Sequence, residues 1–354
     1  MPQAVRAGRA RLPLRENPPL GESARRDMTK FLLRRLANWV VLVVLATSLA
    51  YVLAATALNP RANYENRRPA PAPAIVDQRL DELNANDKTP MLDRYATWAK
   101  GVVQGDFGQT VNGEPVSDEI GRRILVSLRL LLIATVLGGA LGVAAGAWSA
   151  VRRNRPGDHA LTVISFTLLA TPPFVLAILL EILAVRFNDL VGASFFEYTG
   201  EFTPGQEGGF LSQGVDRVQH LVLPSLTLIL AEVAIVSRYQ RSAMLDVLGS
   251  DFVRTAQAKG LRRRAALIKH ALRTALIPSA TFFAYNFGLL LIGATFTEKI
   301  FGWHGMGEWF VDSVTQSDVN AVAAVSCFAA VLVLVAGLLS DVAYAILDPR
   351  IRVS

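Results

Sequence analysis

Charged residues and cysteine are both scarce in this chain of 354 residues. Asp, Glu, Lys and Arg together make up 18% of the sequence, whereas hydrophobic residues make up 52%. Soluble domains carry about 25% charged residues. The one cysteine, Cys327, excludes an internal disulfide. The shortage of charge and the excess of apolar residues indicate a protein that contacts lipid.

The sequence also lacks the motifs that carry common catalytic chemistry. A P-loop needs a glycine directly before its lysine, and none of the lysines follows a glycine. The four histidines form no His-Glu-x-x-His pair, and no Gly-x-Ser-x-Gly elbow is present. We therefore expect no catalytic residue, no bound cofactor and no metal site in this chain, so that an energy source is supplied by a partner.

Apolar residues gather in six blocks, each close to the roughly 20 residues that cross a bilayer. They run over 39–58, 130–151, 160–180, 221–236, 277–297 and 319–340. Most basic residues flank the blocks on one side, which the positive-inside rule makes cytosolic. This placement accounts for the positive net charge without nucleic acid. We predict an all-α membrane protein with six transmembrane helices, both termini cytosolic, and a cytosolic helical loop between helices 4 and 5.

The same blocks divide the chain into five segments. We expect a disordered cytosolic tail (1–27), a first transmembrane helix (28–58), an extracytoplasmic insertion (59–123), a five-helix core with its loop at 244–276 (124–347) and a second cytosolic tail (348–354). The insertion contains two weakly amphipathic stretches, around 74–83 and 92–103, which predict short helices.

Glycine and proline mark two places inside the apolar blocks. Gly138, Gly142 and Gly146 recur at steps of four, so a neighbouring helix can approach that face closely. Pro172-Pro173 interrupts the third block and must bend or break its helix. The prolines fit a packing kink and a bend that shapes a pore equally well.

Glu232 and Asn286 are polar residues inside the apolar blocks that suggest a functional role. Glu232 is in the fourth block and Asn286 in the fifth. An acid in lipid is energetically expensive and often functional. We interpret both as candidates to line a pore or a helix interface, and Glu232 leaves a proton relay as a less favoured alternative.

The polar stretch 244–276 is too long for a simple turn and predicts two short helices. Ser250 or Asp251 can cap the first helix, and Gly260 lets the chain leave it. The second helix, 262–275, separates an apolar side from a basic side. The chain then enters the membrane at Pro278, which we expect in the first turn of the next helix. The apolar side consists of Leu267, Ile268 and Leu272, and the basic side of Arg263, Arg264, Lys269 and Arg273.

Two runs in this stretch, Asp251-Phe-Val-Arg-Thr-Ala-Gln-Ala-Lys-Gly-Leu261 and His270-Ala-Leu-Arg-Thr-Ala-Leu-Ile-Pro278, resemble the coupling loop of binding-protein-dependent ABC importer permeases. In that family the loop docks into an ATPase subunit. The resemblance implies a docking role for Asp251, Arg254, Thr255, Ala256, Ala258, Lys259, Gly260, His270, Arg273 and Pro278. From the residues alone, a basic amphipathic loop lying on anionic lipid fits equally well.

The chain resembles the B-type permease of dipeptide and oligopeptide importers from about Thr29 to the C-terminus. Within that family, its sequence is most similar in character to actinobacterial oligopeptide systems. Short pieces carry it in order: Phe31-Leu-Leu-Arg-Arg35, Gly105-Asp-Phe-Gly108, Thr171-Pro-Pro-Phe174, His220-Leu-Val-Leu-Pro-Ser225, Glu298-Lys-Ile-Phe-Gly302 and Leu347-Asp-Pro-Arg350. His304 departs from the pattern, because relatives usually carry proline there.

The resemblance implies a permease subunit that moves peptides into the cytosol by alternating access. Its implied partners are a second homologous permease, ABC ATPase subunits that hold ATP and magnesium, an extracytoplasmic peptide-binding protein and the lipid of the bacterial cytoplasmic membrane. Nickel or another small solute remains an alternative cargo. A proton-coupled secondary carrier is less favoured, because such carriers usually contain internal repeats and none is visible here.

Overall fold

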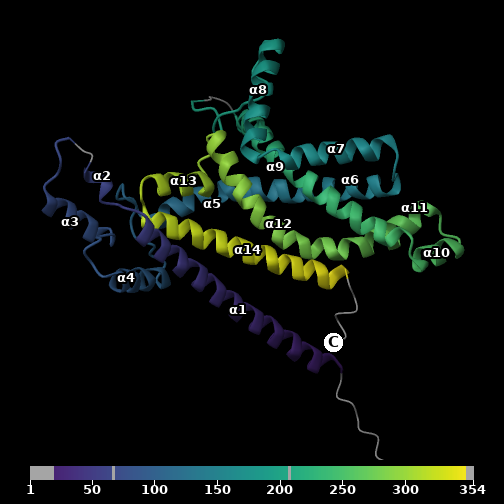
Figure 1. Cartoon of the computed structure of the whole chain (residues 1–354), viewed down its shortest axis with the longest axis horizontal. Helices are drawn as coiled ribbons and strands as arrows, with labels where there is room; N and C mark the ends of the chain where they lie inside the picture. Colours follow the sequence, from purple (N-terminus) through teal and green to yellow (C-terminus); the bar gives the residue numbers. More distant parts are fainter. Residues whose placement is uncertain (1–19, 66–67, 206–208, 348–354) are drawn as a thin grey trace, which may run out of the picture. The chain divides into compact units, whose positions relative to one another are not determined.

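The computed structural model describes residues 20–65, 68–205 and 209–347, and every regular element in that part is a helix (Figure 1). The helices are α1 (Leu20–Ala57), α2 (Ala62–Glu65), α3 (Pro73–Glu82), α4 (Met91–Val103), α5 (Val116–Ile133), η1 (Ala134–Gly138), α6 (Gly139–Val151), α7 (Pro156–Ala170), α8 (Pro173–Val191), α9 (Phe210–Leu248), α10 (Asp251–Ala258), α11 (Arg263–Ala266), η2 (Leu267–Leu272), α12 (Arg273–Ile300), α13 (Met306–Thr315) and α14 (Val319–Leu347), where η marks a π-helical segment. The predicted all-α class is confirmed.

The chain divides into two compact units, residues 1–45 and 46–354. The first unit contains the N-terminal part of α1, which begins at Leu20 directly after Pro18-Pro19. The predicted tail reached to residue 27, so its last eight residues are helical here. The prolines explain the difference, because a proline disfavours helix in the residue before it but not in those after it. Residues 1–19 and the predicted tail 348–354 lie outside the described residues.

Helix α9 is the element around which the second unit packs. It contacts η1, α6, α7, α8 and α12, and α12 in turn contacts α13 and α14. The main apolar core joins α5, α8, α9 and α12 through side chains such as Leu131, Ala177, Leu228 and Ala294, all at most 3% exposed. A long central helix therefore fixes the positions of the shorter ones.

The three glycines spaced by four lie where η1 and α6 cross α9. A Cβ atom added at Gly138 would lie 2.7 Å from the Cβ of Glu232, and one added at Gly142 would lie 2.7 Å from the Cβ of Val236. Gly146 faces the backbone of α9 at Ser237 even more closely. The predicted close approach of a neighbouring helix is confirmed, and α9 is that neighbour.

The polar insertion folds onto the ends of α1 and α14. The two short helices expected there are present as α3 and α4. Trp98 of α4 stacks on Tyr51 of α1 with ring centroids 4.4 Å apart, and both pack against Val322 of α14. The amide of Asn320 donates to the carbonyl oxygens of Leu83 and Gln109, each at 3.0 Å. Aromatic stacking and backbone hydrogen bonds thus attach the insertion.

A group of charged side chains holds α3 to the loop after it. The guanidinium of Arg61 lies 2.8 Å from Asp77 and also contacts Asp87, while the Lys88 ammonium donates to Asp77. These contacts lower the pKa of Asp77, first through Lys88 and then through Arg61. Arg61 likewise lowers the pKa of Asp87.

Helix α5 begins at Val116, whereas the sequence placed the end of the insertion at residue 123. The first turns of α5 are amphipathic, and fully buried Val116 packs with Trp309 of α13 and Ala324 of α14. The charged residues of these turns are paired, because Arg122 and Arg123 both contact Glu119. Because these charges have partners on one face of the helix, α5 can begin before residue 123, the predicted end of the insertion.

By length and composition, four helical stretches among the described residues could cross a membrane: 36–65, 116–151, 210–248 and 319–343. Helices α7 and α8 make a fifth if the two, bent by 108°, count as one span. The remaining predicted span, 277–297, lies within α12 and stays a prediction.

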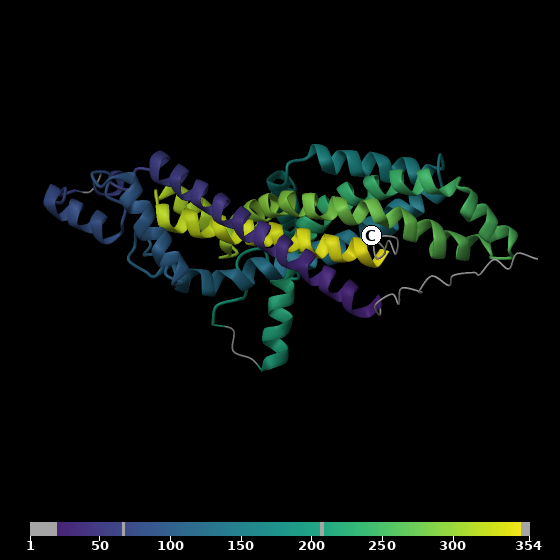
Figure 2. The same cartoon turned by 90° about the horizontal axis from the view of Figure 1, so that it is seen from below.

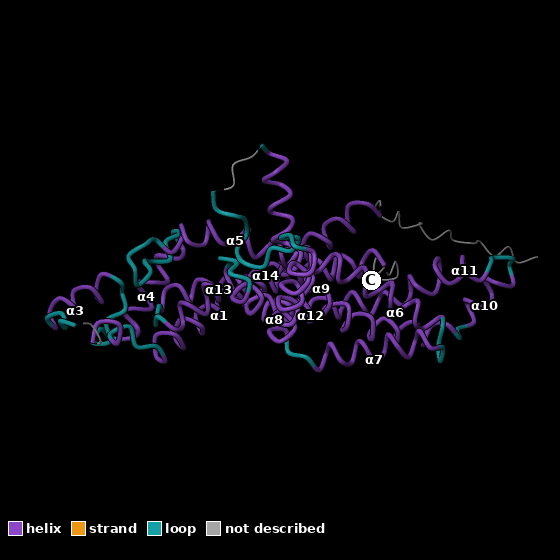
Figure 3. Tube along the Cα trace, turned by 90° about the horizontal axis from the view of Figure 1, so that it is seen from above, coloured by secondary structure: helices purple, strands orange, loops and turns teal. Residues whose placement is uncertain are grey.

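Within the second unit, the insertion and the loop between α9 and α12 lie at opposite ends. Figure 2 and Figure 3 both place α3 and α4 at one end of the long helices and α10 and α11 at the other. Helices α9, α12 and α14 run between the two ends. The predicted extracytoplasmic and cytosolic parts are therefore well separated in the fold.

Candidate functional site

Helix α10 is the first of the two short helices expected in the polar stretch. Ser250 precedes it in extended backbone, at φ −71° and ψ 149°, but its hydroxyl donates to the carbonyl oxygen of Val247 at 2.7 Å and makes no capping hydrogen bond. Gly260 follows the helix at φ +89°, where glycine is favoured over residues with a Cβ atom. Both residues occupy the predicted places, and only the capping contact is missing.

The inner face of α10 rests on a small apolar cluster. Val253 packs there with Met244 of α9, Ala150 of α6 and Leu267 of η2, together with Ala271 and Ala275. Burial of these side chains removes apolar area from water and fixes α10 against three longer helices. Ala256, predicted as a docking residue, is only 7% exposed. Its side chain supports α10 from below and is not part of the outer surface.

The outer face of α10 is short, basic and partly apolar. Phe252 is 45% exposed, and its exposed neighbours are Asp251, Arg254, Thr255, Ala258 and Lys259. Arg254 and Asp251 approach to 3.8 Å, but both side chains are in solvent, so this contact contributes little to stability. We name Asp251, Phe252, Arg254, Thr255, Ala258 and Lys259 the docking face.

The second predicted helix is not separate from α12, which follows it. Helices α11, η2 and α12 follow one another without a gap from Arg263 to Ile300, so Pro278 lies inside α12 and not at its first turn. The π-helical segment η2 also turns Ile268 outward, where it is 61% exposed, although Leu267 is buried as predicted. Predicted docking residues His270 (half-buried) and Arg273 (exposed) lie on this run beside α10.

The double proline breaks its helix, as the sequence predicted. Helix α7 ends at Ala170 and α8 begins at Pro173, where the missing N–H costs no helical hydrogen bond. The two helices meet at 108° (Figure 1). Pro173 lies against Gly293 of α12.

Glu232 of α9 and Asn286 of α12, the polar residues predicted to line a pore or a helix interface, contact each other. The amide nitrogen of Asn286 donates to Glu232 Oε2 at 2.6 Å, and the side chains are 2% and 3% exposed. They border a cavity of about 370 Å³ between η1, α6, α9, α12 and α14. The other amide atom, Asn286 Oδ1, is buried and has no hydrogen-bond partner in the described part. Asn286 Oδ1 can therefore accept a hydrogen bond from a donor at this cavity. Pro172 and Pro173, the other predicted pore residues, do not line it.

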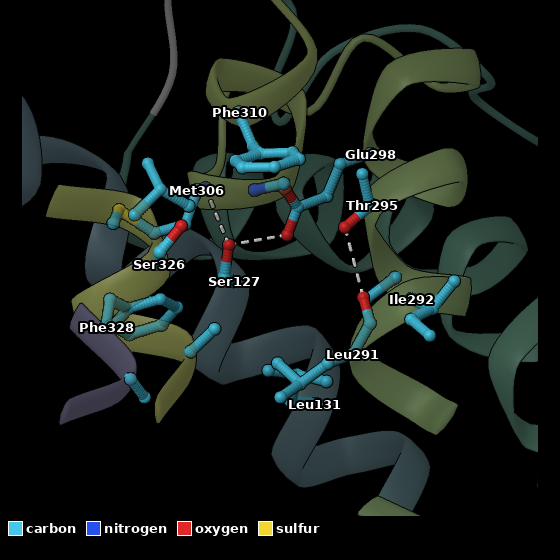
Figure 4. A pocket seen from close by; sticks show the side chains of 15 residues that line it. Ser127, Leu131, Leu291, Ile292, Thr295, Glu298, Met306, Phe310, Ser326 and Phe328 are labelled. Atoms are coloured by element: carbon cyan, nitrogen blue, oxygen red, sulfur yellow. Dashed lines mark hydrogen bonds between the residues drawn. The ribbon is translucent and has the colours of Figure 1, made fainter. Parts of the chain in front are cut away.

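Glu298 is another buried acid, which the sequence indicated only as the start of a family-like piece and not as a site residue. Figure 4 shows its carboxylate beside Ser127, whose hydroxyl donates to Glu298 Oε1 at 2.5 Å and accepts from the Met306 N–H at 2.8 Å. The backbone N–H of Gly307 donates to Glu298 Oε2 at 2.7 Å. Glu298 therefore accepts hydrogen bonds from backbone N–H groups in the first turn of α13, which have no partner within that helix. Its side chain lines an apolar cavity of about 360 Å³. Ser127 and Glu298 are 171 positions apart in the sequence, so no local sequence pattern could predict their hydrogen bond.

Sequence reasoning also missed the ion pair between Asp158 and Arg241. Arg241 Nε donates to Asp158 Oδ1 at 2.7 Å and Nη2 donates to Oδ2 at 2.8 Å, a bidentate contact between α7 and α9. Among the described residues, no group of three or more His, Cys, Asp or Glu side chains could hold a metal ion.

Comparison with known proteins covers most of the chain. The family model described as binding-protein-dependent transport system inner membrane component matches residues 142–353. The chain is 54% identical over 327 residues to the oligopeptide transport system permease protein OppB of Mycobacterium tuberculosis, covering 92% of this chain and 100% of that protein. It is 34% identical to AppB of Bacillus subtilis (92% and 100% covered) and to the dipeptide permease protein DppB of Escherichia coli K12 (78% and 84% covered).

Proposed function

Since the chain belongs to the family of binding-protein-dependent transport system inner membrane components, we propose that it is the permease subunit of an ATP-driven importer that brings peptides into the cell. The observation that carries the proposal is the 54% identity to an oligopeptide permease protein along 92% of this chain. The chain itself is a multi-pass membrane protein and not an enzyme, and ATP is hydrolysed by partner subunits.

Six membrane spans fit the helices of the chain. In this arrangement the spans are α1, the run from α5 to α6, the bent pair α7 and α8, α9, α12 and α14. Basic residues then flank the end at which α10 and α11 lie, which the positive-inside rule assigns to the cytosol. The insertion carrying α3 and α4 faces outward, and both termini are cytosolic.

The docking face is the surface that meets an ATPase subunit. Its base on α6, α9 and α12 is apolar and closely packed, so a force applied to α10 reaches three long helices. Packed helices move as rigid bodies when an interface between subunits rearranges. Movement of the ATPases would thus tilt α9 and α12, and open the path alternately to the two sides.

The assembly comprises a second homologous permease, two ATPase domains that bind ATP and magnesium, and an extracytoplasmic binding protein that delivers the peptide. Its place is the bacterial cytoplasmic membrane. The cavity at Glu232 and Asn286 and the break at Pro172-Pro173 belong to the translocation path or to its interface with the second permease. Nickel or another small solute is the rival cargo, and the relatives named for peptides argue against it.

The test is purification of this chain with its co-purifying subunits in mild detergent, followed by measurement of peptide-stimulated ATPase activity and peptide uptake in proteoliposomes. A258W places a bulky side chain on the docking face, and A74W places one on exposed α3 as the matched control. We choose Ala258 over Gly260, because any side chain at φ +89° adds backbone strain of its own.

We expect A258W to remain in the membrane, to lose the co-purifying ATPase and to lose uptake, whereas A74W retains the ATPase. An A258W chain that binds the ATPase as the unmodified chain does would exclude the docking face. ATPase activity that is stimulated by a nickel chelate and not by any peptide would show that nickel, and not peptide, is the cargo.

A further inference from the structure

The carboxylate of Asp158 receives hydrogen bonds from three different parts of the fold. Besides the two bonds from Arg241 of α9, the backbone N–H of Asn154 donates to Oδ2 at 2.9 Å, and the hydroxyl of Ser149 of α6 donates to Oδ1. Asp158 itself is on the first turn of α7 and is 1% exposed. One buried side chain therefore joins α6, the turn after it, α7 and α9.

The helices are already in close contact at this level. A Cβ added at Gly146 of α6 would lie 3.0 Å from the backbone nitrogen of Arg241. Further along, the hydroxyls of Ser165 of α7 and Ser237 of α9 are 3.3 Å apart. Arg238 of α9 also stacks over the ring of Phe166. The contacts of Ser165 with Ser237 and of Arg238 with Phe166 are directional.

The ion pair lies next to the base of the docking face. Ser149 precedes Ala150, and Arg241 lies one helical turn before Met244; Ala150 and Met244 both pack against Val253 of α10. In the other direction, α7 runs from Asp158 to Ala170 and meets the bend at Pro172. The pair is therefore located between the surface that receives movement and the break in the third span.

Apolar surfaces can slide over one another, because dispersion and burial have little directional preference. A bidentate contact between a guanidinium and a carboxylate fixes both distance and orientation. Here the carboxylate of Asp158 is buried, whereas the side chain of Arg241 is 29% exposed. Breaking it would leave a charge buried without its partner. Of the contacts that α7 makes with α9, this one resists sliding most strongly.

We propose that Asp158 is a positioning residue that makes α7 move together with α9, so that displacement of the docking face is delivered to the bend between α7 and α8. The proposal rests on the proposed function, because it assigns a role within ATP-driven transport. Asp158 contacts neither peptide nor ATP, and it acts through Arg241.

The alternative is that the pair only stabilises the fold. The two roles differ in one ratio, the amount of peptide taken up per ATP hydrolysed by the assembled complex. A stabiliser changes the quantity of folded complex and leaves this ratio constant. A mechanical link changes the ratio itself, because hydrolysis continues without moving α7.

The experiment compares D158N, R241K and the unmodified chain as assembled complexes in proteoliposomes, with uptake and ATPase activity measured on the same sample. Asparagine keeps the size of Asp158 without its charge, and lysine keeps the charge of Arg241 without its two-pronged geometry. E201Q is the control, since it removes a different ion pair, that of Glu201 with Arg129 of α5, which includes neither Asp158 nor Arg241.

We expect uptake per ATP to fall about 2- to 30-fold in D158N and R241K, the range in which single residues alter coupling between sites. E201Q should leave it unchanged. Equal ratios in D158N, R241K and the unmodified complex would overturn the proposal and leave the importer function intact. An unmodified complex without peptide uptake would instead remove the proposed function.

A cross-link supplies a rescue test that a purely stabilising role would not pass. S165C and S237C, placed in a D158N, C327S background, put two thiols where the hydroxyls are 3.3 Å apart. Once oxidised, the disulfide holds α7 to α9 in place of the ion pair. We expect oxidation to raise uptake per ATP towards the unmodified value and reduction to lower it again. A ratio that stays low with the disulfide formed would contradict the link.

Discussion

Replacement of Gly146 by alanine tests how closely α6 is packed on α9. The added Cβ would lie 2.9 Å from the Cβ of Gln240 and 3.0 Å from the Arg241 nitrogen, and closer still to the carbonyl oxygen of Ser237. Two of these three neighbours are backbone atoms of a long helix, so they cannot rotate away. Helix α6 must shift outward from α9.

Two opposing terms set the size of the effect. Alanine is favoured over glycine in a helix by about 1 kcal/mol, and overpacking of a close contact costs about 1–3 kcal/mol. Because backbone atoms are involved, we take the upper part of that range, and G146A should lose about 1–2 kcal/mol of unfolding free energy. G139A is the matched control, since a Cβ at Gly139 in the same helix meets no atom within 4 Å.

The assay is unfolding of the purified chain by sodium dodecyl sulfate in mixed micelles, followed by circular dichroism. We expect G139A to be as stable as the unmodified chain or more stable, and G146A to unfold at lower detergent fraction. If G146A is as stable as G139A, then α6 and α9 are not in the close contact described, and the argument from the glycine positions fails.

Two further predictions concern charge. E232Q keeps an oxygen that can accept the hydrogen bond from Asn286 but removes the ionisable carboxyl group from the cavity wall, so peptide uptake should fall several-fold with ATPase binding unchanged. Full uptake would make Glu232 a packing group. Because Lys88 and Arg61 lower the pKa of Asp77, the stability they contribute is present above its ordinary pKa of about 4 and is lost as pH falls through the lower folded value. The protection of α3 amides against hydrogen exchange, measured relative to the intrinsic exchange rate at each pH, should therefore fall on acidification below about pH 4. D77N should abolish that fall, whereas an equal fall in D77N would assign it to other groups.

Local patterns in the sequence predicted the local features of the fold. Glycines at steps of four predicted a close helix contact, and the pair Pro172-Pro173 predicted a break, because each depends on the chemistry of neighbouring residues alone. Patterns could not identify α9 as the helix that the glycines face. Likewise, Gly260 was recognised as the exit from α10 since its left-handed backbone needs glycine.

The failures have a shared physical cause, which is contact between distant parts of the chain. Ala256 looks like a small docking residue in sequence, yet packing from α10 onto its base buries it. Asp158 and Arg241 are 83 positions apart, so their pairing leaves no mark at either position. Pro278 was expected to start a helix, but the residues before it are held in helix by the cluster around Leu267.

The π-helical segment η1 changes how relatives of this chain should be aligned. A π turn is equivalent to one extra residue in an α-helix, which rotates everything after it by about 100°. Before η1, α5 directs Val116 toward α13 and α14; after it, α6 directs Gly142 and Gly146 toward α9. A one-residue gap is usually dismissed as alignment noise, but a gap between positions 134 and 138 would mark a homologue whose second span presents a different face to its neighbours.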